Sequence, residues 1–463
     1  MSSISSGRPT FGLFGASPYN EKPMDKGTTK ERFVIEGLGG KKTLKGELFI
    51  RGAKNAALKA LAASILFEDE VRLENMPQIE DVERMSEILR SSGARIDRTD
   101  DVVAIVPPKK WKPELERSIA SRIRASIVLT GPMLADMGEV KFPFPGGCVL
   151  GERPIDLFLM GFAAMGASTQ EDADGNFTVR APRGGTLRGA RIFFPKVSVT
   201  ATETLMLAAV LAEGETVLEN AAMEPEIPAL AAFLNECGAR IEGAGATTVH
   251  IRGTAGKPLR AEGRTMRMPP DRIDAGSFII LGALAGKDLA IRGCEPKHLG
   301  SLLSALSRAG VPLEVGRDFV RVAAGDVPNE KFKSISIQTH EYPGFPTDLQ
   351  ALYAVLLTQT SGEATILETI FDGRFRYADD LVRMGADITV MNPHKILIRG
   401  PKRLSRKELE APDLRAGLAY ILAAAVADGT SIVDNAYVID RGYEDIEARL
   451  GRVGLSIRRE PAA

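Results

Sequence analysis

Residues 216–253 read TVLENAAMEPEIPALAAFLNECGARIEGAGATTVHIRG, which is a short strand, a loop, an amphipathic helix ending at glycine, and further strand. The same order of elements recurs along the chain, closely at 71–106, 289–322 and 365–400, and more loosely from about Val140 and Ser431. Self-similarity at regular spacing identifies a repeat architecture before any single motif does. The sequence therefore predicts an α/β fold in which one structural unit is used six times.

A second recurring element is an apolar helix that begins with polar residues. The six segments read GAKNAALKALAASIL, RASIVLTGPMLA, SVTATETLMLAAVLA, DRIDAGSFIILGALA, FPTDLQALYAVLL and DLRAGLAYILAAAVA. Helices that are apolar nearly all round are buried, and their first turns present unpaired N–H groups that favour anionic ligands. The polar residues in these first turns are Lys54, Asn55, Arg124, Ser198, Asp271, Asp348 and Arg415. Helix capping would explain the Ser and Asp residues but not the cations. The pattern therefore predicts a cleft for a ligand that carries phosphate or carboxylate.

Length and composition limit the number of domains, the kinds of partner and the cellular location that the sequence allows. A length of 463 residues with 44% hydrophobic content is typical of two or more domains with large cores. The net charge of −1 and the lack of basic runs argue against nucleic acid as a partner. Three scattered cysteines and four histidines predict neither a disulfide framework nor a metal site. Residues 1–31 lack the apolar block of a secretory signal, and no stretch would span a bilayer. We expect a cytoplasmic protein with a flexible N-terminal extension and no membrane association.

Residues 141–158, KFPFPGGCVLGERPIDLF, place Cys148 on a glycine-flanked loop with Arg153 five residues later. Exposure and a nearby cation favour the thiolate, so this thiol is a candidate nucleophile or acid–base group. The alternative of an ordinary, half-buried thiol fits Cys237 and Cys294 better. Arg153 and Pro154 form a flat pair that suits a planar heterocycle, with Asp156 as an acceptor for a ring N–H.

Asp348, in EYPGFPTDLQ, is either a helix cap or a general base, and the sequence leaves both open. Five arginines stand at or near repeat junctions: Arg124, Arg153, Arg374, Arg415 and Arg441. Converging arginines without matching acids indicate a polyanionic ligand, because guanidinium binds carboxylate and phosphate through two hydrogen bonds. The alternative for each arginine alone is a solvated surface position.

Together these motifs resemble the UDP-N-acetylglucosamine enolpyruvyl transferase family. GAKNAAL, RASI, PGGC-x-x-G-x-RP-x-D, PDRI, YPGFPTD, DLRA and IDRGYE occur in family order between about Phe33 and Arg459. The resemblance implies a two-domain inside-out α/β prism of six βαβαββ repeats, three per domain. Residues 54–262 would form the first domain, which carries the Cys148 loop. Residues 32–53 plus 263–463 would form the second, with the active site in the cleft between the two.

The resemblance also implies an activity. The enolpyruvyl group of phosphoenolpyruvate would pass to the 3-hydroxyl of UDP-N-acetylglucosamine with release of phosphate, the first committed step of peptidoglycan synthesis, without a cofactor. Cys148 would be the acid that can add to phosphoenolpyruvate and that fosfomycin alkylates, and Asp348 the base. Lys54, Arg153, Arg374 and Arg441 would bind phosphoenolpyruvate, and Arg124 and Arg415 would line the cleft. The expected nucleotide contacts are Asn55 and Ile370 for the sugar, Arg153, Pro154, Ile155, Asp156 and Leu157 for uridine, and Lys196, Ser198 and Val199 for the diphosphate.

Three positions depart from the family pattern. Phe158 and Val438 stand where the family usually has histidine, and Thr200 where it has glycine. These changes favour an altered acceptor pocket, as in related enzymes that attach enolpyruvate to a uridine nucleotide such as UMP in nucleoside-antibiotic pathways. Asn55 and Asp348 favour the sugar nucleotide instead. A non-catalytic sugar-nucleotide binding protein is a third reading, which the full set of reactive residues opposes.

Overall fold

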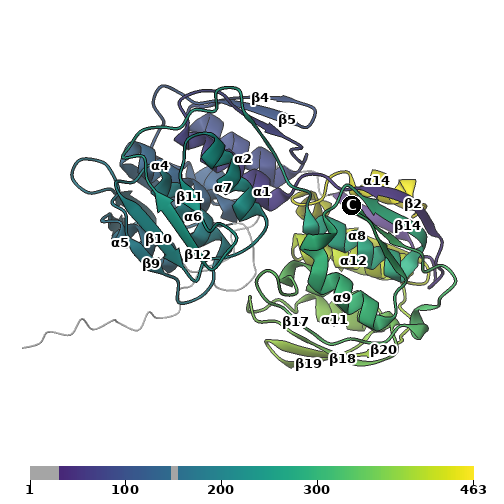
Figure 1. Cartoon of the computed structure of the whole chain (residues 1–463). Coiled ribbons are helices and arrows are strands. Elements are labelled where there is room, and N and C mark those ends of the chain that lie inside the picture. The colour runs from purple at the N-terminus through teal and green to yellow at the C-terminus, as the bar shows by residue number, and fades with distance from the viewer. Residues whose placement is uncertain (1–30, 147–154, 463) are drawn as a thin grey trace, which may run out of the picture.

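The structure, a computed structural model, describes residues 31–146 and 155–462, so Cys148, Arg153 and Pro154 lie outside the described residues, as do residues 1–30 of the predicted extension. Glu31, its predicted last residue, instead begins the first strand of the fold. The chain forms two lobes, each with its own hydrophobic core (Figure 1). The core of lobe 1 is built from residues within 53–268. The core of lobe 2 is built from residues 33–50 together with residues within 273–455.

Lobe 1 has three sheets, with strand orders β13-β3-β5-β4, β6-β8-β7 and β11-β12-β10-β9. Its strands are β3 (Val71–Glu74), β4 (Arg95–Thr99), β5 (Val102–Val106), β6 (Glu139–Pro143), β7 (Ser168–Glu171), β8 (Asn176–Arg180), β9 (Arg191–Phe193), β10 (Glu215–Glu219), β11 (Ile241–Glu242), β12 (Thr248–Arg252) and β13 (Thr265–Arg267). Its helices are α1 (Lys54–Ala63), η1 (Ser64–Leu66), α2 (Glu80–Ser91), α3 (Arg117–Ala120), η2 (Arg124–Leu129), α4 (Thr130–Met137), α5 (Asp156–Ala164), α6 (Val199–Val210) and α7 (Glu226–Glu236).

Lobe 2 also has three sheets, with strand orders β21-β22-β1-β23, β15-β16-β14-β2 and β17-β18-β20-β19. Its strands are β1 (Glu31–Glu36), β2 (Leu44–Phe49), β14 (Gly286–Arg292), β15 (Leu313–Val315), β16 (Phe319–Val322), β17 (Ile337–Gln338), β18 (Gly362–Leu367), β19 (Asp387–Asn392), β20 (Lys395–Gly400), β21 (Glu408–Glu410), β22 (Thr430–Asp434) and β23 (Ile457–Pro461). Its helices are α8 (Arg272–Ala285), η3 (Pro296–Leu299), α9 (Gly300–Ala309), η4 (Asn329–Lys331), η5 (Thr347–Leu349), α10 (Gln350–Gln359), α11 (Tyr377–Arg383), α12 (Leu414–Val426), α13 (Ala436–Asp440) and α14 (Ile446–Arg452).

The two kinds of helix predicted from the sequence differ in burial. In α12 every residue from Leu414 to Val426 is buried, because the segment is almost entirely Ala, Leu and Ile. In α2 burial is confined to one face, which includes Val82, Met85 and Leu89 at helical spacing. The close copies in the sequence share one order of elements, since 216–253 forms β10, α7, β11 and β12, and 71–106 forms β3, α2, β4 and β5. The apolar helices therefore lie inside the lobes, where they pack against the sheets, as α8 does against β14 and α10 against β20.

The chain passes from lobe 2 to lobe 1 and back at adjacent points. The Ala53 N–H donates to the Pro269 carbonyl (2.7 Å), and the Asp271 N–H donates to the Arg51 carbonyl (2.9 Å). Between them Gly52 is so close to Asn75 that a Cβ would lie 1.9 Å from its carbonyl oxygen. Only glycine fits this position, so the two crossing segments form one tight paired junction next to the start of α1.

Candidate active site between the lobes

A cavity of about 260 Å³ lies where the lobes meet, and residues of both lobes line it. The first turns of all six apolar helical segments reach it. They contribute Lys54 and Asn55, Arg124 and Ala125, Val199 and Thr200, Arg272 and Ile273, Thr347 and Asp348, and Leu414 and Arg415. Helix N-termini from two lobes therefore face a single space, an arrangement that suits an anionic ligand.

Asp81 joins a cation from each lobe. Lys54 Nζ lies 2.6 Å from Asp81 Oδ2, and Arg441 Nε lies 2.9 Å from Asp81 Oδ1. Burial alone would raise the pKa of Asp81, but Lys54 and Arg441 hold it below the ordinary value. Burial lowers the pKa of Lys54, against the opposing effect of Asp81. The sequence analysis missed Asp81, because it is one of three acids in the first turn of an ordinary amphipathic helix.

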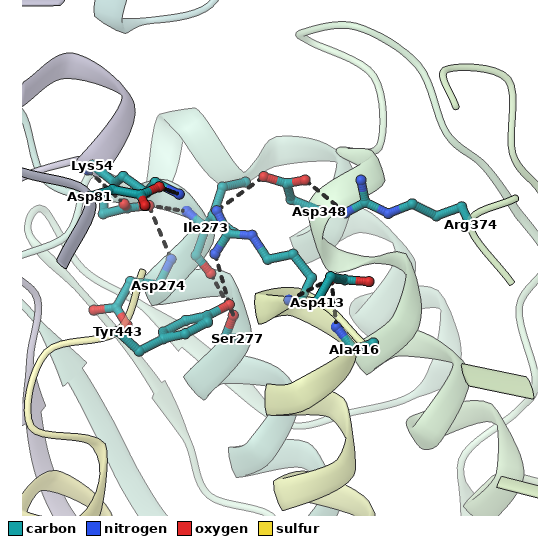
Figure 2. Close-up of polar contacts among 12 residues, drawn as sticks. Lys54, Asp81, Ile273, Asp274, Ser277, Asp348, Arg374, Asp413, Ala416 and Tyr443 are labelled. Atoms are coloured by element: carbon teal, nitrogen blue, oxygen red, sulfur yellow. Dashed lines mark hydrogen bonds and ion pairs between the residues drawn. The ribbon is translucent and has the colours of Figure 1, made fainter. Parts of the chain in front are cut away.

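Asp348 joins two more cations on the lobe 2 side, as Figure 2 shows for Arg374. Arg374 Nη2 lies 2.9 Å from Asp348 Oδ1, and Arg415 Nη2 lies 3.0 Å from Asp348 Oδ2. Burial alone would raise the pKa of Asp348, but Arg415 and Arg374 hold it well below its usual range. The carboxylate is therefore ionised and faces the cavity, with 27% of its side chain exposed.

Further hydrogen bonds hold Arg415 and the first turns of α1 and α8 in place. Arg415 Nη1 donates to Tyr443 Oη (2.8 Å), which lies 3.4 Å from Ser277 Oγ. Asp271 caps α8 by accepting the Ile273 and Asp274 N–H groups, and it also accepts the Lys54 N–H (3.0 Å). The capping interpretation is thus right for Asp271, which ties the start of α1 to the start of α8.

Ser198 also caps a helix, because its hydroxyl accepts the Ala201 N–H (3.2 Å) at the start of α6. Asp348 does not: within the described chain, neither η5 nor α10 has a side-chain cap, and the Asp348 carboxylate contacts two arginines instead. The helix-cap interpretation is therefore wrong for Asp348, and its role as a general base stays a prediction.

The other predicted site residues fall into two groups. Asn55, Arg124, Val199 and Ile370 line the cavity, and Lys196 Nζ reaches across the lobe boundary to the Ile370 carbonyl at 3.4 Å. Ile155, Asp156 and Leu157 are not among the described cavity-lining residues; they lie at the start of α5, directly after the segment that the structure does not describe. Their assignment to uridine stays a prediction, as do those of Arg153 and Pro154.

Acidic residues at the lobe 1 end of the cavity were also missed. Lys59 Nζ lies 3.0 Å from Glu203 Oε2 inside the helix layer, and burial raises the pKa of Glu203 to about 8. Glu224 accepts the Tyr342 N–H from lobe 2 at 3.2 Å, and burial raises its pKa as well. The sequence held one signal for the Lys59–Glu203 pair. Each of these charged residues lies inside an otherwise apolar helix, where neither helix capping nor an exposed polar face explains it.

The three departures from the family pattern occupy different environments. Phe158 is buried in the core of lobe 1 and Val438 in the core of lobe 2. Among the described residues that line the cavity, Thr200 is present and these two are not. Thr200 is therefore the one of the three that faces the cavity.

The two described cysteines lie in the hydrophobic cores of the lobes. Cys237 and Cys294 are buried, and burial raises the pKa of each thiol to about 11. Over residues 31–146 and 155–462 no group of three or more His, Cys, Asp or Glu could hold a metal ion. Over the same residues no helix combines the length and apolarity needed to cross a bilayer.

Comparisons with known proteins agree with the resemblance drawn from the motifs. A profile of the EPSP synthase (3-phosphoshikimate 1-carboxyvinyltransferase) family matches residues 38–450. The UDP-N-acetylglucosamine 1-carboxyvinyltransferase of Acidobacterium capsulatum is 44% identical over 93% of this chain and 96% of its own. That of Koribacter versatilis is 43% identical over the same shares.

Solved structures share the fold. The enolpyruvyl transferase NikO from Streptomyces tendae superposes with a TM-score of 0.83, at 24% identity over 94% of this chain and all of that one. EPSP synthase from Acinetobacter baumannii gives a TM-score of 0.70 at 18% identity, over 93% of this chain and all of that one. The predicted α/β class is confirmed, and the chain belongs to the EPSP synthase family of carboxyvinyltransferases, on the branch of the UDP-N-acetylglucosamine 1-carboxyvinyltransferases.

Proposed function

We propose that the chain transfers the enolpyruvyl group of phosphoenolpyruvate to the 3-hydroxyl of UDP-N-acetylglucosamine and releases phosphate, in the first committed step of peptidoglycan synthesis. The observation that carries the proposal is the identity of 40–44% to enzymes of that name over at least 92% of the chain. Four cations, Lys54, Arg374, Arg415 and Arg441, line one cavity, which suits a substrate with both phosphate and carboxylate.

The roles of the site residues belong to this proposal. Protonation of the methylene carbon of phosphoenolpyruvate makes the neighbouring carbon oxocarbenium-like, and Cys148 supplies that proton. The sugar 3-hydroxyl oxygen attacks this carbon and gives its proton to Asp348. The tetrahedral adduct then returns a proton from its new methyl group to the Cys148 sulfur as the bond to phosphate breaks, and the leaving phosphate takes the proton held by Asp348. Lys54 and the arginines stabilise the phosphate and carboxylate charges throughout, as preorganised cations do.

Binding of the nucleotide is assigned by the same reasoning. Asn55 and the Ile370 backbone would contact the amino sugar, since both line the cavity beside Asp348. Lys196, Ser198 and Val199 would hold the diphosphate at the start of α6, where free N–H groups favour anions. The residues around Asp156 would hold uridine, by resemblance alone.

The domain and fold assignments are also proposals. The two separate cores support two domains divided close to the predicted bounds of 54–262 and 32–53 plus 263–463, but they move the second boundary to about residue 268, because Met266 and Met268 belong to the core of lobe 1. Six sheets in the described chain, three per lobe, support two inside-out prisms built from six βαβαββ units. We place the reaction in the cytoplasm, with small molecules as partners and neither nucleic acid nor membrane.

A second candidate function is enolpyruvyl transfer to UMP, which Thr200 favours because it lines the cavity where the family usually has glycine. The burial of Phe158 and Val438 removes the other two reasons for it.

Phosphate release from phosphoenolpyruvate should therefore occur with UDP-N-acetylglucosamine and not with UMP, assayed in parallel. Turnover with UMP alone would overturn the assignment. Absence of phosphate release with either acceptor would favour a binding protein.

Fosfomycin should label the peptide that contains Cys148 and no other cysteine peptide. Thiolate is the reactive form, and thiols with a pKa of about 11, as at Cys237 and Cys294, are protonated at neutral pH. Peptide mass spectrometry after labelling at pH 7 checks the result. Cys148→Ser is the control that should abolish labelling, and an adduct on Cys237 or Cys294 would contradict the role of the loop thiol.

A further inference from the structure

We propose that Asp81 is a positioning residue of this site. Its carboxylate acts as a resident counter-ion that holds Lys54 and Arg441 together across the lobe boundary, and the anionic substrate displaces this carboxylate when it binds. The inference rests on the proposed function in one respect, that the displacing anion is phosphoenolpyruvate.

The two carboxylate oxygens of Asp81 contact cations from different lobes. Oδ2 contacts Lys54 of α1 at 2.6 Å, and Oδ1 contacts Arg441 of lobe 2 at 2.9 Å. Asp81 is 3% exposed, and all three side chains line the cavity. A carboxylate therefore already occupies the space between two cations that a substrate phosphate or carboxylate would otherwise bridge.

Charge balance explains why such a group is needed. Two cations brought together from different lobes in a poorly hydrated cavity repel each other, and leaving them uncompensated is costly. Asp348 compensates the charges of Arg374 and Arg415 in the same way, on the lobe 2 side of the cavity. With Asp81 displaced, the four cations and Asp348 leave a net charge of 4 − 1 = +3. A ligand with a phosphate and a carboxylate brings about −2.5 to −3 near neutral pH, which nearly balances that charge.

Asp81 is not required merely to tie the lobes together. The same end of α2 makes two other contacts with lobe 2: the Gln78 N–H donates to Glu444 Oε2 (2.9 Å), and Tyr437 Oη lies 3.3 Å from Glu80 Oε1. These contacts do not involve the cavity cations. What Asp81 adds is the position of Lys54 Nζ and Arg441 Nε relative to each other.

A counter-ion that competes with substrate has a distinctive signature. Asp81→Asn removes the competing charge but keeps the side-chain shape, so inorganic phosphate should bind at least about tenfold more tightly. The same change should lower kcat at least about tenfold, because product phosphate leaves more slowly when no carboxylate returns to compete for Lys54 and Arg441. A purely structural role predicts weaker phosphate binding and a lower melting temperature instead.

The test is titration calorimetry of the full chain with inorganic phosphate, followed by steady-state kinetics. Glu83→Gln is the matched control, since Glu83 lies on the exposed face of the same helix and pairs with Arg90; both readouts should be unchanged. Asp81→Glu is the second variant, which keeps the competing charge and should keep both phosphate affinity and kcat closer to wild type than Asp81→Asn does. Weaker phosphate binding in Asp81→Asn, or an unchanged kcat, would overturn the proposal. If wild type released no phosphate from phosphoenolpyruvate with any acceptor, the proposed function would fail, and the calorimetric result would still decide the role of Asp81.

Discussion

Asp348→Asn should lower kcat by about 10³-fold while binding of UDP-N-acetylglucosamine remains. The carboxylate is the group proposed to take the hydroxyl proton, and loss of a positioned base typically costs 10²–10⁴-fold. Asparagine still offers one oxygen to Arg374 or Arg415, which now contact the two carboxylate oxygens at 2.9 and 3.0 Å. Steady-state kinetics and calorimetric titration with the nucleotide separate turnover from binding.

Asp288→Asn is the matched control, because Asp288 likewise accepts two hydrogen bonds from arginine, both from Arg321, but its side chain is about half exposed and lies outside the cavity. Its activity should equal wild type. Lost nucleotide binding with unchanged residual chemistry in Asp348→Asn would contradict the base assignment. Because the pKa of Asp348 lies below the ordinary aspartate value, its proton is already lost above about pH 5. The kcat/KM profile of the wild type should therefore show no acid limb from this residue above that pH.

Arg415→Lys should lower kcat/KM for phosphoenolpyruvate by about 10²-fold and also lower the melting temperature. Arg415 contacts Asp348 with one nitrogen and Tyr443 Oη with another, at 3.0 and 2.8 Å. One ammonium group cannot reproduce that fork, so either the base or the buried tyrosine loses its partner. Loss of one preorganised donor typically costs 10²–10³-fold, and an unsatisfied buried hydroxyl costs about 1–3 kcal/mol.

Arg399→Lys serves as the comparison, since Arg399 pairs with Glu363 through side chains that are both exposed to solvent. Neither its kinetics nor its thermal unfolding should change. An Arg415→Lys variant with wild-type kcat/KM would show that the second contact of the guanidinium is dispensable and that a single charge is enough.

The sequence predicted the convergence of the cavity cations well, because the pattern that encodes it is local. Each of Lys54, Arg124 and Arg415 stands within the first turn of an apolar helix, and six such helices in a repeat fold bring their ends together. The family motifs then identified the chemistry.

What the sequence did not indicate is how the charges pair. Asp81 meets Lys54 only because α2 packs beside α1, and it meets Arg441 only because the lobes approach there. Glu203 looked like one polar residue in an apolar helix, and its partner Lys59 lies on another helix. Such pairings depend on tertiary geometry across 27 to 360 residues of chain, for which a single sequence carries no local signal.

The paired junction at Gly52 also has a consequence for synthesis of the chain. Because the core of lobe 1 is continuous in sequence, it can complete its folding on the ribosome before lobe 2 has been translated. β1 must wait, since its partners β22 and β23 come at residues 430–461. At about 5–20 residues per second, that delay is roughly 20 to 90 s. During this time β1 and β2 of the nascent chain have open edges, and core residues such as Phe33, Ile35 and Leu44 have no partners, so residues 31–49 form a segment that a chaperone would protect.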